Sequence, residues 1–249
     1  MRKIMLLTFA CCLPLFLARS VRSDDQDDLK RVIDKGIKAA GGEEKLSKFK
    51  AGTCKIKGKI LEDKEGTFAF EAFLQGGEQV KVAGDLDVQG MQTKVAFVVN
   101  GDQGWARFTD NVEDAPKEVL ASIKDILRTF RYVHALTPLK DKAATLSPLG
   151  EVNIDGQAAV GIKVGCKDQK DINVFLDKAT GLPLKAEVTI SKDGQDETVE
   201  FTLSEYKEFN GAKHFTKVAV KQNGKPILEA ELSEFKWLDQ IEANVFDKP

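Results

Sequence analysis

The sequence predicts a mainly β protein: a long antiparallel meander of about 10–11 strands, with one helix before the strands and another among them. Apolar residues alternate with polar ones in many segments, which is typical of strands with one buried face. Asn-Gly and Asp-Gly pairs, the strongest short hairpin signals, separate several of these segments. A meander of one-faced strands must curl into a barrel, a half-barrel or a sandwich to bury its apolar side.

The N-terminus has the pattern of a secretory signal peptide. Arg2 and Lys3 provide a basic start, and the apolar run from Ile4 to Ala18 is shorter than the roughly 20 residues of a membrane-spanning helix. Cleavage near Ser23/Asp24 would leave a soluble, exported protein without a transmembrane segment. We therefore expect the protein in the periplasm or cell envelope.

Residues 1–23 are thus expected to be the signal peptide, and residues 24–249 a single domain, because no linker divides them. The whole chain has a formal net charge of −2, and its first 23 residues carry basic but no acidic side chains, so the remainder is more acidic. An acidic excess without a basic block argues against nucleic acid binding. Cys11 and Cys12 leave a second interpretation open, in which one of them is lipid-modified.

Helical spacing of apolar residues begins directly after the signal peptide. Four aspartates crowd its start, where carboxylates oppose the positive end of the helix dipole. Gly41 and Gly42 are expected to end the helix, and Leu46 with Phe49 suggests one more short turn. The apolar stripe consists of Leu29, Val32, Ile33, Ile37 and Ala40.

From Thr53 the period of the apolar residues changes from near 3.6 to 2. Cys54, Ile56 and Ile60 alternate with lysines, so one face of this strand meets a core and the other meets water. The same alternation predicts strands in residues 67–75, 78–87, 91–100, 105–108, 157–166, 172–176, 184–190, 199–203, 216–220 and 228–232.

A long amphipathic helix is predicted over Asp114–Leu136, inside the strand region. Asp114 is expected to cap the helix, and Pro116 suits its first turn. The continuous stripe has two interpretations, either packing in the core or a lid over a ligand cavity. Its members are Val119, Leu120, Ile123, Ile126, Leu127, Phe130 and Val133.

Two cysteines follow the signal peptide, Cys54 and Cys166, and each lies on the apolar face of a predicted strand. In an oxidising compartment they could form a disulfide. The alternative is a pair of unpaired buried thiols that pack as small apolar side chains.

The sequence contains no recognisable catalytic or cofactor motif, and we expect neither an enzyme nor a metal or cofactor site. It has two histidines and lacks the zinc, nucleophile-elbow, phosphate-loop and dinucleotide patterns. His134 falls near the end of the central helix, where a cationic side chain suits the dipole. His214 is interpreted as a strand-edge residue, and Trp105 and Trp237 are expected to close the ends of a core.

Several turns and strand ends resemble those of exported proteins of the LolA/LolB-like lipoprotein-carrier superfamily. The likeness extends over most of the chain after the signal peptide. It rests on Ala39-Ala40-Gly41-Gly42 with Leu46, the turn from Asn100 to Trp105, the segment from Val174 to Pro183, the turn from Tyr206 to Gly211, and the closing Phe246-Asp247-Lys248-Pro249.

This resemblance implies a curved antiparallel sheet that forms an incomplete barrel, with helices covering its open side and an apolar cavity that takes acyl chains. The implied partner is an apolar ligand or a lipid-modified protein. The alternative is an envelope protein–protein interaction module with a filled core and no small ligand. Candidate cavity-lining or lid residues are Phe68, Phe70, Phe97, Leu120, Ile123, Leu127, Phe130 and Phe201.

Overall fold

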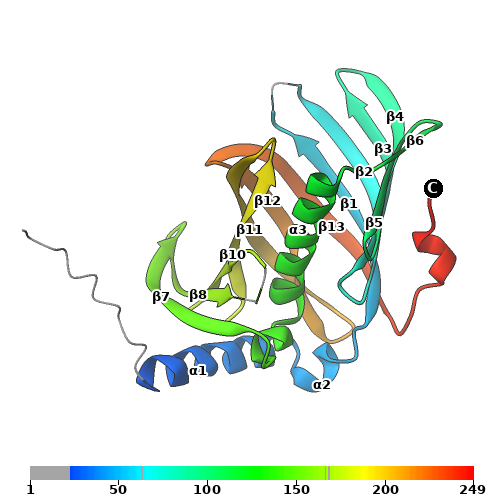
Figure 1. Cartoon of the computed structure of the whole chain (residues 1–249). Helices are drawn as coiled ribbons and strands as arrows, with labels where there is room; N and C mark the ends of the chain where they lie inside the picture. Colours follow the sequence, from blue (N-terminus) through cyan, green and yellow to red (C-terminus); the bar gives the residue numbers. More distant parts are fainter. Residues whose placement is uncertain (1–22, 63, 166, 168) are drawn as a thin grey trace, which may run out of the picture.

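The computed structural model describes residues 23–62, 64–165, 167 and 169–249, so the predicted signal peptide lies almost entirely outside the described residues. The fold is one curved antiparallel sheet of 13 strands that does not close, with a helix across its hollow side (Figure 1). The prediction of an incomplete barrel is therefore confirmed. The described ranges contain no helix that is both long and apolar enough to cross a membrane.

The sheet consists of two meanders that meet where the first strand pairs with the last. The first meander contains β1 (Ala51–Ile60), β2 (Gly66–Gln75), β3 (Gln79–Val88), β4 (Met91–Asn100), β5 (Gln103–Phe108) and β6 (Asn111–Asp114). The second contains β7 (Thr145–Ile154), β8 (Gln157–Gly165), β9 (Ile172–Asp177), β10 (Pro183–Lys192), β11 (Gln195–Phe209), β12 (Ala212–Gln222) and β13 (Lys225–Leu238). Because β1 pairs with β13, β6 and β7 become the two free edges.

The helices are α1 (Ser23–Ala40), α2 (Glu43–Leu46) and α3 (Lys117–Ala135), with short 3-10 turns η1 (Thr137–Lys140) and η2 (Ala243–Phe246). Gly41 and Gly42 end α1 with φ angles of 130° and 90°, as predicted. The chain between β6 and β7 forms α3, which therefore crosses the hollow side from one free edge to the other (Figure 1).

Two details of the sequence prediction were wrong. The two extra strands, β6 and β7, lack clear alternation; β7 contains Pro148 and Gly150, and its register shifts between them. An edge strand buries little, so its sequence carries a weak periodic signal. The central helix begins at Lys117 after Pro116, whereas Asp114 ends β6 and forms an ion pair with Lys248 instead of capping the helix.

The main core lies between the second meander and helices α1 and α3. Inner side chains of β8–β10, such as Ile162, Val174 and Ala186, are 0% exposed. Helix α1 packs closely here, since a Cβ at Gly36 would lie 2.3 Å from the carbonyl oxygen of Gly181. This half of the molecule is therefore densely filled.

The C-terminal segment covers the outer face of the first meander. Ile241 and Phe246 are buried there against Ala51 and Val98. The Ile241 amide donates to Gln75 Oε1 at 2.6 Å. Side-chain amides then link Gln75 to Gln79, Gln79 to Asn100 and Asn100 to the Phe246 carbonyl, at 2.9, 2.9 and 3.3 Å. The outer side of these strands is thus held by the end of the chain.

Candidate functional site

The strand register brings apolar side chains of the first meander together on its inner face. One row of directly opposed residues runs through Ile56, Phe70, Gly84, Val95 and Phe108. The next row includes Ala72, Val82, Phe97 and Ala106. Side chains of opposed residues share one face of a sheet, so these rows form a continuous apolar surface.

Part of this surface is accessible. Phe97 is 36% exposed and Phe108 is 43% exposed, and their rings meet edge to face with centroids 5.8 Å apart. Phe70 and Val82 are half-buried. We call this surface the open inner face and define it by Ile56, Phe70, Val82, Leu86, Phe97 and Phe108.

Helix α3 covers the part of the same face around Val80 and Val99. Leu120 forms a small buried cluster with Val80 and Val99, and the half-buried Ile123 and Leu127 pack against that cluster. Three of the predicted lid residues therefore lie on the edge of α3 that meets the first meander.

The remaining predicted residues lie in two other places. Phe68 is buried and stacks on Phe70, with ring centroids 4.9 Å apart, so it supports the open inner face from beside it. Phe201 is buried in the main core, and the half-buried Phe130 packs against it edge to face, with ring centroids 5.0 Å apart. The eight candidates thus divide among the inner face of the first meander, the edge of α3 that meets it, and the main core with its border.

Polar contacts attach α3 to the second meander. Ser122 Oγ donates to the Ser191 carbonyl at 2.8 Å, and the Gly194 amide donates to Glu118 at 3.1 Å. Arg128 donates to the carbonyl oxygen of Lys170, next to β9. Toward the first meander, α3 makes apolar contacts and an exposed ion pair between Lys124 and Asp102. The hydrogen bonds of α3 to the sheet named here are therefore on its second-meander side.

His134 lies in the last turn of α3, as predicted, but its expected charge and the predicted place of His214 were wrong. His214 is 1% exposed rather than a strand-edge residue, and its ring lies 5.8 Å from that of His134. Burial lowers the pKa of His214 to about 4. Burial, and secondarily His214, lower the pKa of His134 to about 3. Both imidazoles are therefore neutral at pH 7, and His134 supplies no cation to the helix dipole.

Cys54 is buried on the inner face of β1 and forms no disulfide within the described part of the chain. Cys166 lies outside the described residues, so their pairing stays a prediction. Burial, and secondarily Glu71, raise the pKa of Cys54 to about 12. Because only the thiolate is a strong nucleophile, this thiol is unsuited to catalysis.

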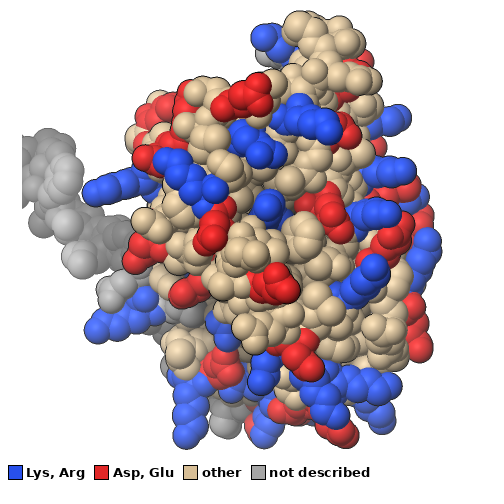
Figure 2. Space-filling view, turned by 90° about the vertical axis from the view of Figure 1, so that its right-hand side faces the viewer, with Lys and Arg blue, Asp and Glu red and all other residues tan. Residues whose placement is uncertain are grey.

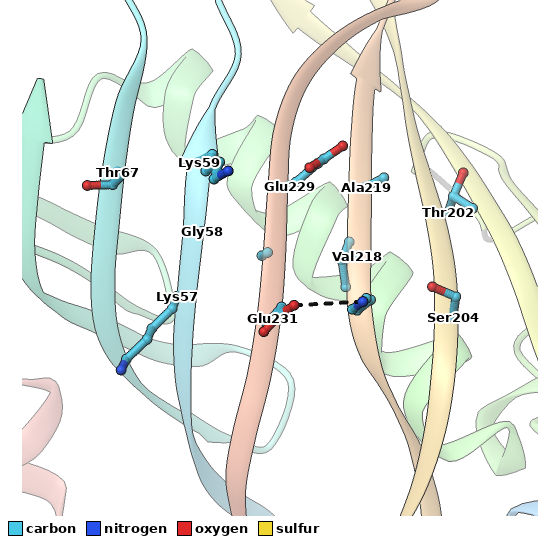
Figure 3. Close-up of a pocket in the computed structure, with 12 residues that line it drawn as sticks. Lys57, Gly58, Lys59, Thr67, Thr202, Ser204, Val218, Ala219, Glu229 and Glu231 are labelled. Atoms are coloured by element: carbon cyan, nitrogen blue, oxygen red, sulfur yellow. Dashed lines mark ion pairs between the residues drawn. The ribbon is translucent and has the colours of Figure 1, made fainter. Parts of the chain in front are cut away.

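A hollow of about 630 Å³ lies on the opposite, outer face of the sheet, on the side away from α3 (Figure 3). Charged and hydroxyl side chains line it, among them Lys57, Glu231 and Thr202. Lys217 forms ion pairs there with Glu205 and Glu231. Val218, Ala219 and Ala230 also belong to its lining, so the hollow combines charged and apolar side chains.

Charges of both signs are mixed on the face seen in Figure 2, without a large area of one sign. Within the described ranges, no group of three or more His, Cys, Asp and Glu side chains is placed to hold a metal ion.

Some residues of the open inner face were not predicted as site residues. Ile56, Val82 and Leu86 were recognised as the apolar side of their strands, and Phe108 as the end of a short strand. Alternation identifies a face but not its exposure, because exposure depends on where α3 crosses the sheet. The signal that could have identified them is the number of apolar residues on these strands, because it exceeds the number that one helix can cover.

No protein-family model matches this chain, and no curated protein matches it. Solved structures do match. A LolA superfamily protein from Nitrosomonas europaea superposes with a TM-score of 0.55 at 11% identity, covering 88% of this chain and 97% of that one. A DUF1329 family protein from Desulfovibrio piger gives 0.54 at 13% identity, covering 88% and 96%.

A third structure is described as an outer membrane lipoprotein-sorting protein domain from Vibrio parahaemolyticus. It has a TM-score of 0.51 and 15% identity, and covers 87% of this chain and 97% of that one. At such low identity these similarities concern the fold and not the activity. The chain therefore has a LolA-like fold, as the resemblance in its turns predicted.

Proposed function

We propose that this protein is an exported, periplasmic carrier-like binding protein that holds an apolar ligand, an acyl chain or a lipid-modified protein, on its open inner face. The observation that carries the proposal is the exposure of Phe97 and Phe108 on the hollow side of the sheet. Burying a large apolar side chain fully stabilises a complex by about 1.5–3 kcal/mol, so two half-exposed rings favour an apolar guest.

The edge of α3 with Leu120, Ile123 and Leu127 forms the movable cover of this site. Its contacts with the first meander are mostly apolar, and an acyl chain can replace them at little cost. Its hydrogen bonds to β10 and to the β10–β11 turn keep the helix attached while that edge lifts.

The proposal includes export and a site without catalysis. The signal-peptide pattern of residues 1–23 and the fold likeness to a lipoprotein-sorting domain support a periplasmic location. The neutral, buried imidazoles and the protonated Cys54 thiol support a binding function rather than an enzyme.

The filled main core favours a second candidate, a protein-interaction module of the envelope without a small ligand. Inner side chains of the second meander are fully buried by α1 and α3, which leaves this half occupied by its own residues. In that case the exposed rings of the first meander would contact a protein.

Displacement of a fluorescent fatty-acid probe, together with mass spectrometry of an organic extract, distinguishes the carrier from the interaction module. We expect saturable probe binding that the double substitution Phe97→Ser, Phe108→Ser weakens by about tenfold or more. The matched control is Leu149→Ser, Val152→Ser, which removes two similarly exposed apolar side chains from edge strand β7. Absence of extracted lipid and of saturable binding would reject the carrier in favour of the interaction module.

A further inference from the structure

The two histidines of the chain meet in an aromatic enclosure at the C-terminal end of α3. The ring of His214, on β12, lies 4.7 Å from that of Trp237 and 5.4 Å from that of Phe235. Phe49 stacks on Trp237 at 4.4 Å, and His134 approaches from the helix. We call these five residues the histidine cluster.

Four polar nitrogens of this cluster are buried without a hydrogen-bond partner among the described residues. They are Nδ1 and Nε2 of His214, Nδ1 of His134 and Nε1 of Trp237. Buried polar groups in proteins are almost always hydrogen-bonded, because an unmade bond costs the full desolvation of the group. Four such atoms in one enclosure indicate a site for a polar group from outside the chain.

The chemistry of these nitrogens selects the group. A neutral imidazole has one donor and one acceptor, and an indole only donates, so the cluster offers both kinds of partner. A hydroxyl matches it, because its O–H can donate to an imidazole nitrogen while its oxygen accepts from two N–H groups. A carboxylate only accepts, and it would bring a charge among aromatic rings that carry none.

The cluster is also continuous with the proposed ligand site. Leu120, Ile123, Leu127, Phe130 and His134 follow one another at spacings of three and four, which places them on one face of α3. This stripe is about 21 Å long at 1.5 Å per residue. It is apolar until its last member, and that member belongs to the histidine cluster.

We propose that the histidine cluster binds the hydroxyl group of an apolar ligand that carries a single hydroxyl, such as a long-chain alcohol. The body of the ligand lies between the first meander and the α3 residues Leu120, Ile123 and Leu127. This inference rests on the proposed function, since it names the chemical class of the apolar ligand.

Competition for a bound naphthylamine probe tests the inference on the full mature chain. Dodecanol should displace the probe at about tenfold lower concentration than either dodecane or dodecanoate, which is the worth of one or two buried hydrogen bonds. His214→Phe and Trp237→Phe keep the aromatic packing but remove the nitrogens, so both should abolish this preference. Trp105→Phe changes the other tryptophan, which lies on the outer face beside the C-terminal segment, and should retain it.

Failure of the site and failure of the proposed function give different results. If the alcohol and the hydrocarbon bind wild type equally, or if the preference survives in the two cluster variants, the hydroxyl site is wrong while the carrier function stands. If none of the three compounds displaces the probe, or the probe does not bind, both are rejected.

Nitrogen-15 NMR of the imidazoles provides a second measurement that does not depend on affinity. The chain has two histidines, so four ring nitrogens can be assigned with the single variants. Dodecanol should shift the signals of His214 and His134, whereas dodecane should not. If dodecanol does not change these signals in the saturated protein, the proposal is overturned. The nitrogens would then bind water.

Discussion

The two meanders of the sheet have similar inner sequences but different environments. In the second meander, Val164, Ile172 and Leu176 are 0% exposed beneath α1 and α3. In the first meander, Phe97 and Phe108 remain more than a third exposed, although Val95, directly opposite Phe108, is only 1% exposed. The same one-faced strand pattern thus forms a core in one place and an accessible surface in the other.

The difference arises from the helices rather than from the strands. Helix α1 packs on the second meander, and α3 is hydrogen-bonded to that meander through Ser122 and Arg128. The first meander is held from its outer side by Phe246 and the amide chain instead. Burial is therefore concentrated in one half of the molecule, and the other half keeps accessible apolar surface.

Two isoleucines of α3 allow the sharpest test of this comparison. Ile126 packs against the main core, whereas Ile123 packs against the small cluster of the first meander. Ile126→Glu should lower the free energy of unfolding by about 3 kcal/mol, because it replaces apolar contacts with the main core by a charge beside that core. Ile123→Glu should cost about 1 kcal/mol and abolish probe binding, because that edge of the helix can lift.

Urea unfolding and probe titration of both variants decide between the two roles. Equal loss of stability in both variants would show that α3 is core along its whole length. In that case its first-meander edge is not a movable cover.

Truncation of one leucine in each half should show the same contrast on a smaller scale. Leu176→Ala, in the filled half, should lower the free energy of unfolding by about 3 kcal/mol through lost contacts and an unfilled cavity. Leu86→Ala, on the open inner face, should cost about 1 kcal/mol because its side chain is already half-exposed. The measurement is the midpoint of urea unfolding of each variant, compared at an unchanged slope of the unfolding free energy against urea concentration. Costs within experimental error of each other would contradict an open first meander.

Acid should weaken the junction between α3 and β12. The pKa values of His134 and His214 in the folded protein, about 3 and about 4, lie below the ordinary value of 6.5. Below that value the unfolded chain binds protons that the folded chain does not, so the free energy of unfolding falls as the pH decreases. Each histidine should contribute about 2 kcal/mol of loss between pH 7 and pH 5.

The double variant His134→Phe, His214→Phe should remove this part of the pH dependence and leave the contribution of the carboxylates. Thermal unfolding at several pH values would reveal it as a flatter profile between pH 7 and pH 5. An unchanged profile would mean that both imidazoles can be protonated in the folded protein over this pH range.

The smallest effect concerns the outer support of the first meander. Gln79→Met keeps the length of the side chain but breaks the amide chain between Gln75 and Asn100. We expect a loss of about 1 kcal/mol in the free energy of unfolding. Hydrogen exchange should become faster at Ile241 and its neighbours, while exchange in β9 should not change. Faster exchange in both places would contradict independent support of the two meanders.

Local structure was predictable where one period dominates. The stripe ending at Ala40, the stop at Gly41 and Gly42, and the long amphipathic helix all followed from spacing and turn chemistry. The strand β7 did not, because an exposed edge carrying Pro148 and Gly150 has no strong alternation. Asp114 was misplaced for a related reason, since a short edge strand continues to the residue that the capping rule would choose.

The site was only half predictable. Candidates such as Phe97 and Ile123 were visible as apolar residues in regular positions, but the same pattern also described Phe201, which is core, and Phe130, which packs against that core. The histidine cluster was not visible, because His134 and His214 are 80 positions apart and each has a common local explanation. Their meeting depends on the pairing of β12 with β13 and on the path of α3.

The sequence by itself determined most of the strands and helices, which side of each is apolar, and that the strands form meanders, because these follow from local periods and turns. Only the tertiary structure decided that β1 pairs with β13 and that α3 crosses from one free edge to the other. Those long-range choices depend on burying all apolar faces at once. They leave the first meander partly uncovered, and that uncovered surface is the candidate site.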